Sequence, residues 1–553
     1  MNRSDSKIKF VGLHAHSVAG SIFDAIGYPQ AHMDFCYENG GDALALTDHG
    51  NMNGLAYQVL HAKKMKEEGK DFKPIFGCEA YFIPSIDEWR EEYTRAMEDK
   101  KRARSAKKDK ASGATVEDEN DSKKTQDILR RRRHMVLLVQ NQTGLNNLFK
   151  LVSESYQPEN FYRYPRIDYK LLKKYNEGII AASACLGGVY AGNYWENREE
   201  GEEAVLEAMR ESTRQMVDIF GDRWYAEIQW NNIKEQHELN KYVIQVAEEM
   251  DVELITTADS HYPSPDAWKD RELYKRLGWL GKGRPSWADE ESQLPEGVEE
   301  IGYELYPKNG DQMWESYKQY SKEQGYEYDD ELIMRSIEQT HKIAFERIES
   351  FLPDNTVRLP EFVVPAGFTA TQALVNYALE GLKDKGLHKN KEYTDRLLHE
   401  LNVIDDRGFS KYFLTMKSIV DVATGMMLTG PGRGSAAGSL VAYALNITQV
   451  DPIKYDLLFS RFLRSDAEDY PDIDYDVSDS MALKEKLVEM WGEDCVAPIS
   501  NWNTLQLKSL IKDISKLYNI PFTEVNTVTS IMIREATPEA KRKHGIKAGV
   551  YAP

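Results

Sequence analysis

DALALTDH (42–49), GLAYQVLHAKKMKEEG (54–69) and PIFGCEAYF (74–82) form the stretch that decides the fold of the first half of the chain. The first and third segments are short apolar runs that predict buried strands, and the middle segment has the spacing of an amphipathic helix. A strand, a helix and a second strand in this order indicate parallel strands joined by a right-handed crossover. The stretch therefore predicts an α/β fold.

The same alternation recurs between residues 8 and 262. The further candidate strands are KFVGLHAH (9–16), HMVLLVQN (134–141), GIIAASAC (178–185), WYAEIQW (224–230) and VELITTADSH (252–261). About seven such units in ~250 residues have the scale of an α/β barrel. The highly charged stretch 99–133 interrupts the pattern, and it holds too few branched aliphatic residues to be buried. We therefore expect a disordered surface insertion there, with contact to nucleic acid as the alternative.

The rest of the chain predicts mainly helices. Residues 263–370 are rich in aromatic side chains, helical patterns dominate 371–428, and a glycine-rich loop, a helix and an acidic strand follow to about residue 480. Residues 481–553 again have a helical pattern. We predict three parts, comprising residues 1–265, 266–503 and 504–553.

The composition restricts the classes of function. The 553 residues include 70 Lys and Arg against 90 Asp and Glu, a formal net charge of −20, which excludes a generally basic nucleic-acid-binding surface. No apolar run approaches the ~18 residues of a membrane span, and the polar start MNRSDSKIKF is not a signal peptide. The 4 cysteines are scattered, which favours a reducing compartment. We expect a cytoplasmic protein without a membrane partner.

Potential metal ligands gather at the ends of the predicted strands. His14 and His16 alternate on one strand and point to one face. The other candidates of the first part are Asp24, Asp48, His49, Glu79, His134, Cys185, Asp259 and His261. Imidazole, carboxylate and thiolate are ligands for zinc, manganese or iron, and in a barrel these positions meet at one rim. Each residue alone is more often a helix cap or a core group, but the set predicts two or three divalent metals that support phosphoryl transfer.

A second candidate site begins with GPGRGSAAGSLVAYAL (430–445). Closely spaced glycines before a helix let backbone N–H groups face a phosphate, and Arg433 adds a positive charge. The loop lacks the GK[ST] of a P-loop, so a flexible turn is the alternative. Downstream, YPDIDYDV (470–477) places Asp472, Asp474 and Asp476 on one face of a predicted strand. Carboxylates and phosphate oxygens are preferred Mg²⁺ ligands, whereas an exposed acidic edge is the alternative.

The first part resembles the PHP (polymerase and histidinol phosphatase) domain of bacterial C-family replicative polymerases. The similar motifs are HAHS (14–17), LTDHGNMNG (46–54), GCEAYF (77–82), HMVLLVQN (134–141), ACLGG (184–188) and ADSHY (258–262). The resemblance implies nine metal ligands, namely His14, His16, Asp24, His49, Glu79, His134, Cys185, Asp259 and His261. The loop between His16 and Asp24 is a residue longer than usual in the family, and the insertion at 99–133 lies outside the family pattern.

The second half resembles the palm of the same polymerases. The motifs are YTDRLLHELNVIDDRGFSKYFL (393–414), GPGRGSAAGSLVAY (430–443), ITQVDPIKYDLLFSRFL (447–463) and PDIDYD (471–476). The resemblance implies a distorted seven-stranded α/β barrel, a mixed α/β nucleotidyltransferase-like palm from 266 to 503 and a partial helical thumb from 504. It implies that Asp472 and Asp474 hold two Mg²⁺ ions, with Asp476 as a secondary candidate. The implied triphosphate site comprises Gly432, Arg433, Gly434, Ser435, Ser439 and Arg461.

The third catalytic carboxylate and the fingers of the family lie beyond the similarity. The chain therefore resembles the amino-terminal half of a split replicative polymerase, from a phage or a divided gene. We expect primer-template DNA, deoxynucleoside triphosphates, replisome proteins and a second polypeptide with the missing elements as partners. The expected activities are DNA-directed DNA polymerase (nucleotidyltransferase) and a metal-dependent 3′–5′ exonuclease. The alternatives are a stand-alone PHP-type phosphoesterase or nuclease and a non-enzymatic replisome scaffold.

Overall fold

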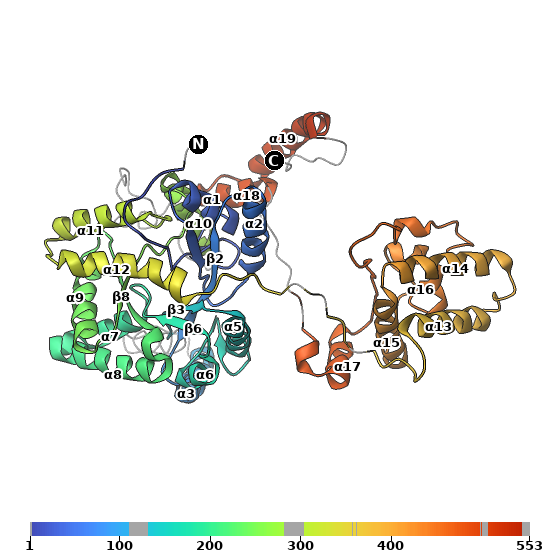
Figure 1. Cartoon of the computed structure of the whole chain (residues 1–553), viewed down its shortest axis with the longest axis horizontal. Helices are drawn as coiled ribbons and strands as arrows, with labels where there is room; N and C mark the ends of the chain where they lie inside the picture. The colour runs from blue at the N-terminus through green and yellow to red at the C-terminus, as the bar shows by residue number, and fades with distance from the viewer. Residues whose placement is uncertain are drawn as a thin grey trace. The chain divides into compact units, whose positions relative to one another are not determined.

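The computed structural model describes residues 3–109, 131–280, 304–497 apart from 355, 357 and 361, residue 499 and residues 507–544. The chain forms two compact units (Figure 1). The first unit joins Met1–Pro353 with Leu505–Pro553, and the second comprises Asp354–Thr504.

The first unit is built around a curled sheet of six strands in the order β1-β2-β3-β6-β7-β8. Strands β1, β6 and β8 are buried at every residue, which is the pattern of strands that are covered on both faces. The predicted α/β fold class is confirmed. The strands are β1 (Ala43–Leu46), β2 (Lys73–Phe82), β3 (Arg133–Val139), β6 (Ile179–Ala182), β7 (Trp224–Gln229) and β8 (Leu254–Thr257).

Strand β3 runs antiparallel to both of its neighbours, whereas the other pairs of the sheet are parallel. The prediction of parallel strands throughout is therefore wrong for β3. Phe82 at the end of β2 pairs with Arg133 at the start of β3. Because the connection leaves and re-enters the sheet at the same edge, the chain must reverse its direction in β3.

The segment predicted as a strand at 9–16 forms single bridges instead of a continuous ladder. Gly12 pairs with Leu44 of β1, and Ala15 pairs with Ser260 just after β8. The backbone N–H of Thr47 donates to Ala15 O at 2.7 Å, and the N–H of His16 donates to Ser260 O at 2.7 Å. The segment therefore lies between the two edge strands of the curled sheet, so that six strands and one bridging segment replace the predicted seven strands.

Helices surround the sheet of the first unit (Figure 1). In α8, Val205, Met209 and Met216 are buried at spacings of four and seven residues, so one face of this helix packs on the core. A short hairpin pairs β4 (Phe161–Tyr162) with β5 (Tyr164–Pro165). The helices up to β8 are α1 (Pro29–Glu38), α2 (Leu55–Glu67), α3 (Ile86–Asp109), α5 (Gln142–Ser155), α6 (Tyr169–Tyr175), α7 (Val189–Asn197), α8 (Glu202–Phe220) and α9 (Lys234–Glu249), with short 3₁₀ turns η1 (Arg198–Glu200) and η2 (Gly221–Arg223).

Helix α3 corrects part of the prediction of disorder at 99–133. Residues 99–109 continue α3 as a helix. Lys, Arg and Ala dominate this part, and all three are good helix formers, so local propensity supports the helix although little can be buried. Residues 110–130, which hold most of the predicted insertion, lie outside the described residues.

The first compact unit extends well past residue 265, where we predicted a boundary. Helix α12 (Asp330–Lys342) packs against β8, and the hydroxyls of Ser336 and Thr256 are 2.8 Å apart. Two fully buried residues of α12, Ile333 and Ile337, belong to the core of this unit. The unit also contains η3 (Pro265–Ala267), α10 (Trp268–Leu280), α11 (Gly310–Gln324), the π-helix η4 (Ile343–Arg347), α18 (Leu507–Leu517) and α19 (Phe522–His544).

The second unit is helical in its described residues, apart from a single antiparallel bridge between Thr429 and Val477. The predicted strand 470–477 forms no further ladder among the described residues, and its backbone contacts with the neighbouring segment are hydrogen bonds from Gly430 N–H to Asp476 O and from Ser478 N–H to Leu428 O. Phe413, Leu440 and Phe462 belong to its apolar core. Its elements are α13 (Ala370–Asp384), α14 (Lys391–Asp406), α15 (Ser410–Met426), η5 (Ser435–Gly438), α16 (Leu440–Ala444), η6 (Phe459–Arg461), α17 (Ser480–Trp491) and η7 (Glu493–Cys495).

Among the described residues, none of the helices combines the length and the apolar character that crossing a bilayer requires.

Candidate metal centre and acidic loop

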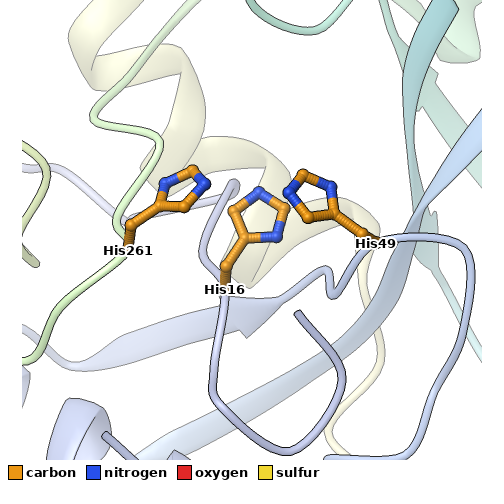
Figure 2. Close-up of side chains that lie close together, drawn as sticks. All are labelled: His16, His49 and His261. Atoms are coloured by element: carbon orange, nitrogen blue, oxygen red, sulfur yellow. The ribbon is translucent and has the colours of Figure 1, made fainter. Parts of the chain in front are cut away.

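The structure brings all nine predicted ligands of the first unit together at one rim of the curled sheet. His49 follows β1, Cys185 follows β6, and Asp259 and His261 follow β8. His134 lies at the start of β3, and it reaches the same rim because β3 runs in the opposite direction. Figure 2 shows the imidazoles of His16, His49 and His261 gathered from three separate segments of the chain.

Glu79 of β2 lies at the centre of the cluster. Its Oε1 is 3.2 Å from His14 Nε2 and 3.1 Å from His134 Nδ1. Its Oε2 is 2.5 Å from His49 Nδ1 and 3.8 Å from His16 Nε2. Burial would raise the pKa of Glu79, but the imidazoles of His134, His49 and His14 outweigh burial and hold this pKa well below its usual range. Glu79 is therefore an ionised carboxylate within a group of imidazoles.

Two further carboxylates face the same imidazoles. Asp259 Oδ1 is 3.2 Å from His14 Nε2, 3.1 Å from His16 Nε2 and 3.5 Å from His261 Nδ1. Asp24 Oδ2 is 3.0 Å from His49 Nε2 and 3.5 Å from His261 Nε2. The longer loop before Asp24 thus still places this carboxylate in the cluster.

Cys185 lies at the side of the cluster formed by His134. Its Sγ is 3.6 Å from His134 Nδ1 and 3.8 Å from Glu79 Oε1. Burial, together with the charges of Asp259 and Glu79, raises the pKa of the Cys185 thiol well above its usual value. A bound cation would reverse this effect, because a coordinating thiol is deprotonated.

The unpaired polar atoms of the cluster fit metal ligation. Among the described residues, the buried side-chain atoms that lie close to one another without hydrogen-bond geometry include His14 Nε2, His16 Nε2, His49 Nδ1, Glu79 Oε2 and Asp259 Oδ1. Buried polar atoms without hydrogen bonds are rare, and these five point toward common centres. Three sets have ligand atoms that all lie within 4.8 Å of one another: His16, His49 and His261; His14, His16 and Asp259; and His49, Glu79 and His134. The donor set is the one that divalent transition metals prefer.

Three residues that the sequence did not single out hold candidate ligands in place, two of them at imidazoles and one at a carboxylate. Glu227 of β7 accepts a hydrogen bond from His14 Nδ1 at 2.8 Å. Ser21 Oγ is 3.1 Å from His16 Nδ1 and donates to Asp48 Oδ1 at 2.9 Å. Arg271 Nη2 donates to Asp24 Oδ1 at 2.7 Å. An acidic residue within the apolar run WYAEIQW was the available signal for Glu227, whereas Ser21 and Arg271 carry no sequence signal.

In the second unit, the three aspartates form an exposed row. Asp472, Asp474 and Asp476 are exposed, whereas the intervening Ile473 and Tyr475 pack against the core. The aspartates therefore share one face of an extended segment, although this segment forms no strand.

The glycine-rich loop lies directly against this row. Gly434 has a φ of +67°, which strains other residues, and a Cβ atom on it would lie 2.1 Å from Asp474 Oδ2, so the Asp474 side chain would also have to move. Arg433 Nη1 is 3.0 Å from Asp476 Oδ1, and the N–H of Gly430 donates to Asp476 O at 2.9 Å. Gly432 and Ser435 of the same loop are exposed, as is Arg461 on η6, which packs against η5.

Ser439 does not share this exposed surface. It is fully buried and caps α16, where its Oγ accepts from the N–H of Ala442 at 3.1 Å. The same hydroxyl donates to Glu400 Oε2 at 2.9 Å. Glu400 also accepts from Arg396 Nε at 2.6 Å and from the N–H of Val441 at 3.0 Å. The side chain of Ser439 is therefore committed to holding the short helix.

Two family models match the sequence. Residues 12–231 match the PHP domain, and residues 372–548 match the bacterial DNA polymerase III alpha NTPase domain.

Similar proteins extend this result over nearly the whole chain. The DNA polymerase III subunit alpha of Aquifex aeolicus is 33% identical over 543 residues, covering 95% of this chain and 41% of that protein. The subunit of Borreliella burgdorferi is 31% identical over 530 residues, covering 95% of this chain and 40% of that protein. A solved amidohydrolase from Chromobacterium violaceum is 12% identical with a TM-score of 0.25, covering 48% of this chain and 96% of that chain.

The chain spans about 40% of the length of the two relatives. It contains a PHP domain and a bacterial DNA polymerase III alpha NTPase domain, and over 95% of its length it is a homologue of DNA polymerase III alpha subunits.

Proposed function

We propose that this chain is a component of a DNA-directed DNA polymerase in DNA replication, and that its first unit hydrolyses phosphodiester bonds as a metal-dependent 3′–5′ exonuclease. The observation that carries the hydrolytic part is the convergence of nine ligand-type side chains from separate segments on one rim. The similarity to DNA polymerase III alpha subunits supports the replicative part.

The ligands of the proposed metals are the nine residues of the cluster. They are His14, His16, Asp24, His49, Glu79, His134, Cys185, Asp259 and His261, and they would hold two or three ions of zinc, manganese or iron. When bound, such ions lower the pKa of a coordinated water and stabilise the charge that develops on a phosphoryl group.

Hydrogen bonds within the chain fix which nitrogen of each imidazole faces the cluster. His14 Nδ1 donates to the carboxylate of Glu227 at 2.8 Å, which keeps a proton on Nδ1, so Nε2 would be the ligand atom once a metal displaces its proton. His16 Nδ1 is held in the same way by Ser21, and His261 Nδ1 donates to Asp259 O at 2.7 Å. The surrounding hydrogen bonds thus select the tautomers that metal ligation requires.

For the second unit we propose nucleotidyl transfer. Asp472 and Asp474 would hold Mg²⁺, and Asp476 is a secondary candidate. Their exposure suits an ion that keeps several of its waters. Gly432, Arg433, Gly434, Ser435 and Arg461 would contact the triphosphate of an incoming deoxynucleotide opposite the primer-template. Ser439, which was predicted to line the same site, would act by holding α16 beneath the loop.

Two substitutions test the assignment of activities to units. Degradation of a single-stranded oligonucleotide labelled at its 5′ end should be abolished in Asp259→Asn and unchanged in Asp472→Asn. Loss of hydrolysis in Asp472→Asn with retention in Asp259→Asn would reverse the assignment. If the wild-type chain does not hydrolyse DNA after loading with Zn²⁺, Mn²⁺ or Fe²⁺, the alternative of a non-enzymatic replisome scaffold is favoured.

We further propose that a second polypeptide supplies the rest of the thumb, the third catalytic carboxylate and the fingers. The support is the match of residues 372–548 to the bacterial DNA polymerase III alpha NTPase domain, together with the resemblance of the second half to a palm that works with these elements. Purified 1–553 should extend a primer negligibly, and addition of the complementing chain should restore synthesis unless Asp474 is replaced by asparagine. Robust extension by 1–553 alone would contradict this proposal.

A further inference from the structure

A cavity of about 330 Å³ lies beside the metal cluster of the first unit. It is lined by three consecutive arginines, Arg131, Arg132 and Arg133, and by the α7 side of the unit, including Gly187, Trp195 and Glu196. Its volume lies within the ~300–1,000 Å³ of small-molecule sites. Neither the sequence motifs nor the ligand cluster assigns it a role.

The wall between the cavity and the cluster is one residue thick. The N–H of His134 donates a hydrogen bond to Gly187 O at 2.8 Å, and the N–H of Gly187 donates a hydrogen bond to Cys185 Sγ at 3.5 Å. A Cβ on Gly187 would lie 3.3 Å from His134 Nδ1, so glycine permits this close approach. A molecule in the cavity would therefore lie next to two of the candidate ligands.

The arginines give the cavity its charge and its connection to the cluster. Arg132 Cζ lies 3.9 Å from the ring centroid of Tyr164 and 5.3 Å from that of Tyr81. The ring of Tyr81 in turn stacks on His49 at 6.1 Å. The guanidinium group of Arg132 is thus connected to the cluster through the ring of Tyr81.

Carboxylates offset part of this charge. Arg133 pairs with Glu196, and Arg131 Nη1 is 3.0 Å from Glu92 Oε2. The Arg131 side chain is 44% exposed, so a phosphate could reach it from solvent. Arginine is well suited to phosphate because its planar fork makes two parallel hydrogen bonds.

Trp195 supplies a fixed aromatic surface. It is 38% exposed, and its Nε1–H donates to Leu186 O at 3.2 Å, which holds the indole in place. Arg198 Cζ lies 4.8 Å from the ring centroid. An exposed indole beside several arginines is the combination that binds single-stranded nucleic acid, since bases stack on the ring and phosphates contact the guanidinium groups.

We propose that this cavity binds the terminal nucleotide of a single DNA strand, with Trp195 stacking on the base and Arg131 and Arg132 contacting phosphates. This inference rests on the proposed nuclease function, and it names the site that holds the substrate of that function. The end of the DNA strand would then lie against Gly187, beside His134 and Cys185.

The test uses the full chain and a phosphorothioate hexathymidylate that resists hydrolysis and carries fluorescein at its 5′ end. In anisotropy titrations, Trp195→Ala should weaken binding by about 10-fold, since stacking contributes strongly for each base. Arg131→Ala should lower the slope of log affinity against log salt by about 0.7, the value for one lost phosphate contact on a single strand. The exposed Phe149→Ala and Arg214→Ala, outside the cavity, are the matched controls.

A second measurement locates the strand end. A 4-thiothymidine at the 3′ terminus should cross-link to the peptides that contain Arg131–Arg133 or Trp195. Wild-type binding in both cavity variants, or cross-links that map only to residues 354–504, would overturn the proposal. The proposal would also be overturned if the cavity variants lost affinity for free thymidine monophosphate to the same extent, and if the wild-type chain bound longer strands no more tightly than the monophosphate. That result would show that a free nucleotide occupies the cavity.

Hydrolysis of bis(p-nitrophenyl) phosphate separates this inference from the proposed function. The wild-type chain and the Phe149→Ala and Arg214→Ala controls should cleave this small phosphodiester, which reports on the metal centre without a DNA strand. If hydrolysis is absent throughout but Trp195→Ala still weakens binding, the nuclease function fails and the binding site stands. If hydrolysis is present but the variants bind normally, the binding site fails alone.

Discussion

Replacing Glu227 with glutamine tests whether the hydrogen bonds behind the cluster control metal affinity. The Glu227 side chain is completely buried, and its Oε1 accepts from His14 Nδ1 at 2.8 Å, Thr257 Oγ1 at 2.5 Å and Gln229 Nε2 at 3.0 Å. Glutamine keeps the volume, so the packing of β7 is preserved. It removes the negative charge that fixes the proton on Nδ1 and makes Nε2 a better ligand.

The expected effect follows from the position of Glu227 behind a single ligand. Loss of such an outer partner weakens metal binding by about 10- to 100-fold, or about 1.4 to 2.8 kcal/mol. Competition with a chelator of known zinc affinity measures the change, and circular dichroism verifies the fold. The exposed Glu253→Gln is the matched control. A folded Glu227→Gln protein whose zinc affinity lies within about twofold of the wild type would refute the reasoning, because the predicted minimum loss is about 10-fold.

Three further predictions address other parts of the molecule. The double variant His14→Ala/His16→Ala should lose metal in elemental analysis, and retention of the full metal content would contradict the proposed ligand set. Glu400→Ala should destabilise the second unit by about 3 kcal/mol in urea unfolding, because buried donors and Arg396 lose their partner; a change below about 1 kcal/mol would contradict this reasoning. Burial raises the pKa of Cys36 to about 12, and a thiol of raised pKa stays protonated and unreactive below that pH. At pH 8 a thiol reagent should therefore label the exposed Cys495 rapidly and Cys36 only after unfolding, and equal rates would be inconsistent with the buried site.

Local sequence patterns predicted the six strands of the curled sheet and placed candidate ligands near their ends, but the predicted strands 9–16 and 470–477 form only isolated bridges. Short apolar runs with polar residues at their ends predict buried strands, and the alternation in HAH predicts that two imidazoles share a face. The nine residues come together because strand ends that meet at one edge of a sheet also bring their side chains together. The alternation in YPDIDYDV likewise predicted that the three aspartates share one face, and the intervening Ile473 and Tyr475 pack inward.

The tertiary structure decided direction, pairing and burial, which depend on residues far apart in the chain. His134 begins its strand, and it joins the rim only because β3 runs antiparallel. Glu227 lies 213 residues from His14, so no local pattern could assign it to that imidazole. Ser435 and Ser439 belong to one motif, yet Ser439 is buried because its hydroxyl donates to Glu400 of another helix. Sequence patterns report the local preference of each segment, whereas contacts between distant segments form only when the whole chain has packed.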